Sequence, residues 1–181
     1  GMDATWAGGT DSLLSLVRLL LQHEDMMVPV EGGSRWDENS QIGKVDGKIN
    51  RMMAVDLAGK GQNALFVAAE KGDQVYLYNK QTKKFEEQAA KLKLGSKTQV
   101  AAWGDFNGDV RIDLASSDGK SLTIWSQGAD GTFASAAVAD KPEGNCVSLQ
   151  ILDVGVKGKA GLVWSSAGAA VLMIPDKEKA G

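Results

Sequence analysis

The sequence predicts an all-β fold: a β-propeller-like array of about three to four four-stranded antiparallel blades, with a short N-terminal helix or degenerate blade. Three features of the 181-residue chain predict this fold. A pattern of apolar runs and turns recurs every 48 or 49 residues. The runs are short and rich in Val, Ile, Leu, Tyr and Trp, and Gly and Asp separate them, which is typical of antiparallel strands. A unit of this length holds four short strands, the size of one propeller blade.

Two sets of landmarks keep the period. In each unit an apolar run ends in an aspartate, and an aromatic residue lies 20 residues before it. Successive landmarks are 49 and 48 residues apart in both sets. The aspartates are Asp56, Asp105 and Asp153, and the aromatic residues are Trp36, Phe85 and Phe133. Because two independent markers share one phase, we expect the aromatic residues to occupy equivalent, buried positions in successive sheets.

The apolar runs locate the individual strands. In one unit we expect strands at residues 64–69, at 75–78 and around Phe85, with the turn EKGD between the first two. In the next unit, expected strands at 114–116 and 122–125 flank the turn SDGK. Each run has the length and composition of a strand, and each turn contains the Gly and Asp that tight turns favour.

The N-terminal segment differs from the repeats. Residues 10–25, TDSLLSLVRLLLQHED, are rich in helix formers and place several leucines on one helical face, so a helix is the first interpretation. A degenerate blade is the alternative, because Asp3 and Asp11 keep the eight-residue separation of two aspartates in the central unit. We therefore divide the chain into an N-terminal extension at 1–35 and propeller repeats at 36–181.

The stretch GDFNGDVRID carries the candidate metal site. Counted from Asp105, the side chains of Asp105, Asn107, Asp109 and Asp113 fall at positions one, three, five and nine, and the carbonyl of Arg111 falls at seven. Calcium prefers several oxygen ligands, and alternate residues of a tight loop can supply them. Three carboxylates held close together repel one another, so a cation would stabilise the loop. The alternative is an Asx-rich hairpin loop without a metal, because turns favour the same residue types.

The motif resembles the FG-GAP, or VCBS, repeat family, whose blades carry D-x-[DN]-G-D-G-x-x-D between their first two strands. The stretch DFNGDVRIDLA matches at Asp105, Asn107, Gly108, Asp109, Asp113 and Leu114, and DGTF ending at Phe133 is also typical of these blades. The best-known relatives are the propellers of integrin α-chains. The resemblance implies a β-propeller, a bound calcium ion, and an extracellular, periplasmic or cell-surface location.

The chain departs from the family pattern at several positions. Val110 stands where the family usually has glycine, and a β-branched residue resists a left-handed backbone. The loop after Asp56 has Lys60 and Ala64 at positions five and nine, and the loop after Asp153 has Lys157 and Gly161 there. Both lysines place a positive charge where a ligand would be needed. The sequence therefore predicts one calcium site rather than three.

Composition argues against several other functions. The formal net charge is −3 and the lysines are scattered, so we expect neither nucleic-acid binding nor membrane insertion. The apolar stretch at 13–21 is too short to span a bilayer and contains Arg18, and the residues before it lack the positive charge of a signal peptide. Cys146 is the only cysteine and His23 the only histidine, so zinc sites and Ser-His-Asp triads have little support.

We expect a non-catalytic, calcium-binding interaction module whose ligand is an unknown protein or glycan. The alternative is the propeller portion of a carbohydrate-active enzyme or a lectin. Trp36 and Trp125 recur in phase with other aromatic residues and are expected in the core, whereas Trp103 and Trp164 do not and are candidates for a surface site. The run at 170–174 matches a third strand, which leaves the last blade open and makes a homo-oligomer possible.

Overall fold

The computed structural model describes residues 42–156 and 158–174, and every element within them is a β-strand. The all-β class is therefore confirmed for this part of the chain. The expected helix at 10–25, its degenerate-blade alternative, the boundary between 35 and 36, and Trp36 lie outside the described residues. Within them, no helix has the length and apolar character needed to cross a membrane.

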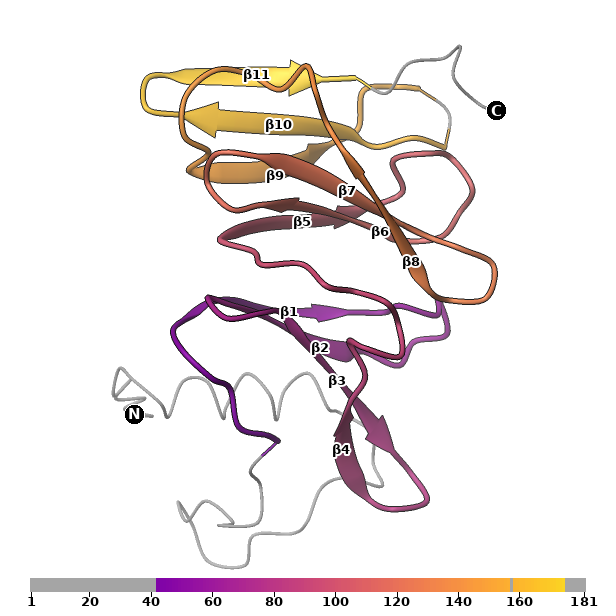
Figure 1. The fold of residues 1–181 in the computed structure, drawn as a ribbon. Helices are drawn as coiled ribbons and strands as arrows, with labels where there is room; N and C mark the ends of the chain where they lie inside the picture. The colour runs from indigo at the N-terminus through magenta and orange to yellow at the C-terminus, as the bar shows by residue number, and fades with distance from the viewer. Residues whose placement is uncertain (1–41, 157, 175–181) are drawn as a thin grey trace, which may run out of the picture. The chain divides into compact units, whose positions relative to one another are not determined.

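The strands form three antiparallel sheets, each assembled in chain order (Figure 1). The first sheet contains β1 (Ile49–Val55), β2 (Ala64–Ala69), β3 (Gln74–Asn79) and β4 (Lys84–Glu87). The second contains β5 (Val100–Gly104), β6 (Asp113–Ser117), β7 (Leu122–Gln127) and β8 (Phe133–Ala137). The third contains β9 (Ser148–Leu152), β10 (Gly161–Ser166) and β11 (Ala169–Met173). None of the three sheets closes on itself.

The expected strands agree closely with the observed ones. The apolar run at 64–69 coincides with β2, and the other predicted runs fall within β3, β6 and β7. The aromatic landmarks Phe85 and Phe133 also lie at matching registers. Phe85 on β4 pairs with Tyr78 of β3, and Phe133 on β8 pairs with Gln127, the last residue of β7. Phe133 is buried as expected, whereas Phe85 is only half-buried.

Neighbouring sheets pack face to face over apolar side chains. The core between the first and second sheets includes Phe66, Val75, Leu114 and Phe133. A second core, between the second and third sheets, is centred on Trp164. The backbones of neighbouring sheets approach most extensively through their first strands, β1 with β5 and β5 with β9. The first strands therefore lie nearer to one another than the outer strands do.

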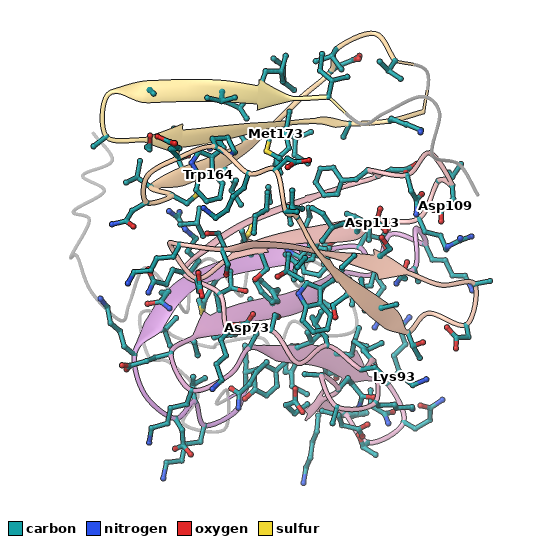
Figure 2. All side chains as sticks on the ribbon, turned by 45° about the horizontal axis from the view of Figure 1, so that its top comes forward. Asp73, Lys93, Asp109, Asp113, Trp164 and Met173 are labelled. Carbon is teal, nitrogen blue, oxygen red and sulfur yellow. The ribbon has the colours of Figure 1, made fainter. Side chains whose placement is uncertain are left out.

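A buried aspartate joins the first sheet to the segment that enters the second (Figure 2). One carboxylate oxygen of Asp73 accepts hydrogen bonds from the amides of Ala69 and Thr98, at 3.1 and 3.0 Å. The other oxygen accepts the hydroxyls of Ser96, at 2.5 Å, and of Thr98. The Thr98 hydroxyl lies 2.6 Å from that of Ser116 on β6. The network thus continues from the β2–β3 turn into the second sheet.

Candidate functional site

The candidate metal loop connects β5 to β6 and is organised by the carboxylate of Asp105. Its Oδ1 atom accepts hydrogen bonds from the amides of Gly108, at 2.6 Å, and Asp109, at 3.2 Å. Its Oδ2 atom accepts the amide of Val110 at 2.7 Å. These three bonds turn the chain tightly, and both Gly108 and Val110 have a left-handed backbone, with φ of 84° and 72°. Asp105 therefore acts as the internal anchor of the loop.

The left-handed backbone at Val110 shows that the expected resistance of valine to this conformation is overcome. Its side chain is 92% exposed, so the unfavourable conformation brings no clash with packed neighbours. The hydrogen bond from its amide to Asp105 stabilises the turn. Valine thus adopts the conformation that suits glycine, at a cost of about 1–2 kcal/mol for a residue with a Cβ atom.

Asn107, Asp109 and Arg111 form the outer part of the loop. The side-chain oxygen of Asn107 accepts the amide of Asp109 at 2.9 Å, and Oδ1 of Asp109 accepts the amide of Arg111 at 2.9 Å. The Arg111 guanidinium forms an ion pair with Oδ2 of Asp109 and also donates to the carbonyl of Gln127 at 2.8 Å. The guanidinium thus provides a positive charge beside the loop carboxylates.

Asp113 lies deeper than a loop ligand is expected to lie. It begins β6 and is fully buried, and its two oxygens accept the amides of Phe106, at 3.1 Å, and Gln127, at 2.9 Å. Burial raises the pKa of Asp113 above its ordinary value, and the negative charges of Asp109 and Asp105 act in the same direction, whereas the two amide hydrogen bonds lower it. The charges of Asp105 and Asp109 thus act on the buried carboxyl of Asp113. Figure 2 labels Asp109 and Asp113.

The loop offers the kind of ligand atom that calcium prefers. Its side-chain oxygens, however, already accept hydrogen bonds from backbone amides, and Asp109 also pairs with the Arg111 guanidinium. Asp105, Asp109 and Asp113 offer carboxylate oxygens and Asn107 offers its amide oxygen, and calcium prefers oxygen ligands. Within the described residues, no three Asp, Glu, His or Cys side chains are gathered so as to hold a metal ion. Binding an ion here would require Asp109 to exchange Arg111 for the metal.

The loop after β1 shows how much of this geometry depends on turn chemistry alone. Asp56 accepts the amides of Lys60, at 3.1 Å, and Gly61, at 2.6 Å, as Asp105 accepts those of the corresponding residues. Gly59 and Gly61 have φ of 64° and 80°, matching the two left-handed residues of the candidate loop. The same backbone conformation thus forms in a loop that has Lys60 where the candidate loop has the proposed ligand Asp109. The turn therefore does not need a metal to take its shape.

The loop after β9 differs from the other two. Asp153 accepts the amide of Gly155 at 2.8 Å, only two residues ahead of it, and Lys157 lies outside the described residues. Gly161 begins β10, where Asp113 begins β6. This loop contacts the candidate loop directly, because the amide of Ala160 donates to the carbonyl of Asp105 at 2.7 Å. The candidate loop therefore helps to join the second and third sheets.

The structure overturns the expectation of a surface position for Trp164 but not for Trp103. Trp164 is fully buried between the second and third sheets. Trp103 is partly buried and packs edge-to-face on Phe66 and Phe133, with ring centroids 5.2 and 6.0 Å apart. Trp125 also packs against this core, as expected. Trp164 alternates with Leu162 along a middle strand, and that alternation was the signal that could have predicted its burial.

Sequence reasoning did not find a cleft bordered by the three first strands. Residues of β1, β5 and β9, together with Asp56 and Ile112, line a space of about 730 Å³. Apolar side chains such as Met53 and Ile151 form part of its wall, and Arg51, Gln150 and Asp56 add polar groups. Asp56 is the single carboxylate among the described residues that line it. The cleft exists because three sheets lie close together. The spacing of residues along the chain does not predict how the sheets are placed.

Comparisons with known proteins give no relative from which a function could be transferred. The chain matches no protein-family model, no curated protein and no solved structure. The interpretation of its function therefore depends on the loop, the sheets and their contacts.

Proposed function

We propose that the chain is a non-catalytic interaction module, built on a β-propeller-like scaffold, whose loop from Asp105 to Asp113 binds one calcium ion. The observation that carries the metal proposal is the burial of the Asp113 carboxyl close to the negative charges of Asp109 and Asp105 in a single tight loop. Because the charges of Asp109 and Asp105 disfavour ionisation of Asp113, a divalent cation would stabilise the ionised loop. The second and third sheets, which meet at this loop, would then be held together more firmly.

Three features support a propeller-like scaffold. The sheets are antiparallel and assembled in chain order, they pack face to face, and their first strands approach one another around a cleft. Blades around a central channel have this relationship, with the first strand of each blade innermost. By resemblance to FG-GAP repeats, we place the protein in an extracellular, periplasmic or cell-surface setting, where a rigid scaffold presents its loops to a protein or glycan ligand.

Calcium-dependent stability tests the metal proposal. Millimolar calcium should raise the melting temperature of the chain, because ligand bound only to the folded state stabilises it in proportion to the logarithm of its concentration over Kd. Asp109→Ala should abolish the rise, because it removes a ligand that the ion would take from Arg111. Asp130→Ala is the matched control: Asp130 is an exposed aspartate in the β7–β8 turn, and this variant should keep the full calcium response.

Arg111→Gln should have the opposite effect on calcium binding to that of Asp109→Ala. The substitution removes the guanidinium that competes for Asp109 but keeps the backbone carbonyl at position seven, so calcium affinity should rise. Isothermal titration calorimetry of the wild type and this variant measures the change directly. An unchanged melting curve in millimolar calcium, together with no heat of binding for either protein, would overturn the proposed site.

A further inference from the structure

Within the described residues, the third sheet has three strands and an open outer edge, whereas the other two sheets have a fourth strand. β3 and β7 each have a neighbour on both sides, because β4 and β8 pair with their outer edges. β11, which occupies the corresponding place, pairs only with β10 among the described strands. Figure 1 shows β11 at the outer edge of its sheet.

Large exposed apolar side chains concentrate at this sheet. Val171 and Leu172 are neighbours on β11 and therefore point to opposite faces, yet each is 41% exposed. A partner packed on one face would cover only one of them, whereas a strand beside β11 would shield both. The exposed large apolar residues on or next to the third sheet are Val147, Ile151, Leu152, Val171, Leu172 and Ile174.

The edge carries none of the usual protection against pairing. β11, Ala169–Met173, has the sequence AAVLM, with no charged residue and no proline. Charges and prolines on edge strands normally prevent association with other chains. β4, by contrast, carries Lys84, Glu86 and Glu87. Among the described strands, none pairs with the outer backbone groups of β11, and these groups can pair with another strand.

We propose that β11 pairs antiparallel with β11 of a second copy of this chain, around a two-fold axis that passes between the two Val171 residues. In this register Ala170 lies opposite Leu172 of the other copy, and Ala169 lies opposite Met173, so each large side chain faces a small one. Two identical uncharged strands bring no like charges together. A two-fold dimer is also the commonest symmetric assembly, and its interface uses the same surface of both copies.

Analytical ultracentrifugation tests the pairing with a charge swap at the axis. The wild type should form a dimer as its concentration rises from about 1 to 200 µM, within the range expected of modest interfaces. Val171→Lys and Val171→Glu should each weaken the dimer at least about tenfold, because like charges would lie directly opposite each other. An equimolar mixture of the two variants should restore the dimer, because opposite charges would then face each other.

Ser135→Lys is the matched control. It places the same charge on an exposed residue of β8, the outermost strand of the second sheet, and should leave dimerisation unchanged. Circular dichroism melts establish that all variants fold. A wild type that stays monomeric at all concentrations, a Val171→Lys variant that dimerises like the wild type, or a mixture that fails to restore the dimer would overturn the proposal.

Discussion

The Oδ2 atom of Asp105 accepts a 2.7 Å hydrogen bond from the amide of Val110, whose backbone is left-handed with φ of 72°. The bond ties the apex of the loop to its first residue. It also holds a β-branched residue in a conformation that glycine adopts without strain. Gly61, at the corresponding place in the loop after β1, makes the same bond to Asp56.

Val110→Gly should therefore stabilise the protein by about 0.5–1 kcal/mol. Relief of the left-handed strain gains about 1–2 kcal/mol, and the greater freedom of glycine in the unfolded chain offsets part of that gain. Urea denaturation measures the change as a higher midpoint with an unchanged slope. Val110→Ala is the control, because it keeps a Cβ atom and should gain much less. A glycine variant less stable than the wild type would contradict the assignment of strain.

The strands of this fold could be predicted from sequence because local patterns encode them. The run at 64–69 is apolar throughout and bounded by polar turns, and it coincides with β2. The near-identical turn after Asp56 and Asp105 could also be predicted, because the aspartate and the glycine three residues after it recur at fixed spacing. Both features depend only on residues close together in the chain.

Features that depend on contacts between sheets could not be predicted in the same way. The spacing along the chain predicts Asp113 as a loop ligand. In the structure Asp113 is the first residue of β6, where it pairs with β5, accepts the amide of Gln127 and is buried. The alternation of Trp164 with Leu162 places both side chains on one face of β10, but only the packing of the second and third sheets buries that face. The cleft requires three first strands to approach one another, which no single repeat specifies.

Phe133→Ala and Phe85→Ala should differ in cost although the two residues have matching registers. Phe133 is 4% exposed and packs on Trp103 between two sheets, so its loss should destabilise the protein by about 3–5 kcal/mol. Phe85 is half-buried against Tyr78, so its loss should cost about 1–2 kcal/mol. Chemical denaturation of both variants measures the difference. Equal costs would indicate that the face-to-face core does not stabilise the fold as described.

Asp73→Ala should destabilise the protein by about 3–5 kcal/mol, because it leaves several buried donors without their acceptor. Asp118→Ala is the comparison: Asp118 is an exposed aspartate whose hydrogen-bond donors belong to its own turn, and its loss should cost about 1 kcal/mol or less. Thermal and urea denaturation measure both. Similar costs for the two variants would show that the network around Asp73 contributes no more than an ordinary turn.

The pH dependence of stability should distinguish the carboxylates of the two similar loops in calcium-free buffer. Burial raises the pKa of Asp113 above its ordinary value of 3.8. Asp113 therefore stabilises the folded state below pH 3.8, and this stabilisation is lost as pH rises through the raised pKa. The hydrogen bond from the amide of Gly61 is the main cause that lowers the pKa of Asp56, so its contribution is present above 3.8 and is lost as pH falls through the lowered pKa.

Asp113→Asn and Asp56→Asn should therefore show opposite trends between about pH 3 and 7. The stability of the wild type relative to Asp113→Asn should decrease as pH rises, because the wild type must ionise a buried carboxylate beside two others. Its stability relative to Asp56→Asn should increase, because the wild type gains an ionised acceptor for the turn. Urea denaturation at several pH values measures both differences, and saturating calcium should abolish the decrease for Asp113 if the ion binds there. Parallel trends for the two variants would mean that Asp113 is not held in the buried, charge-coupled environment from which the calcium site is inferred.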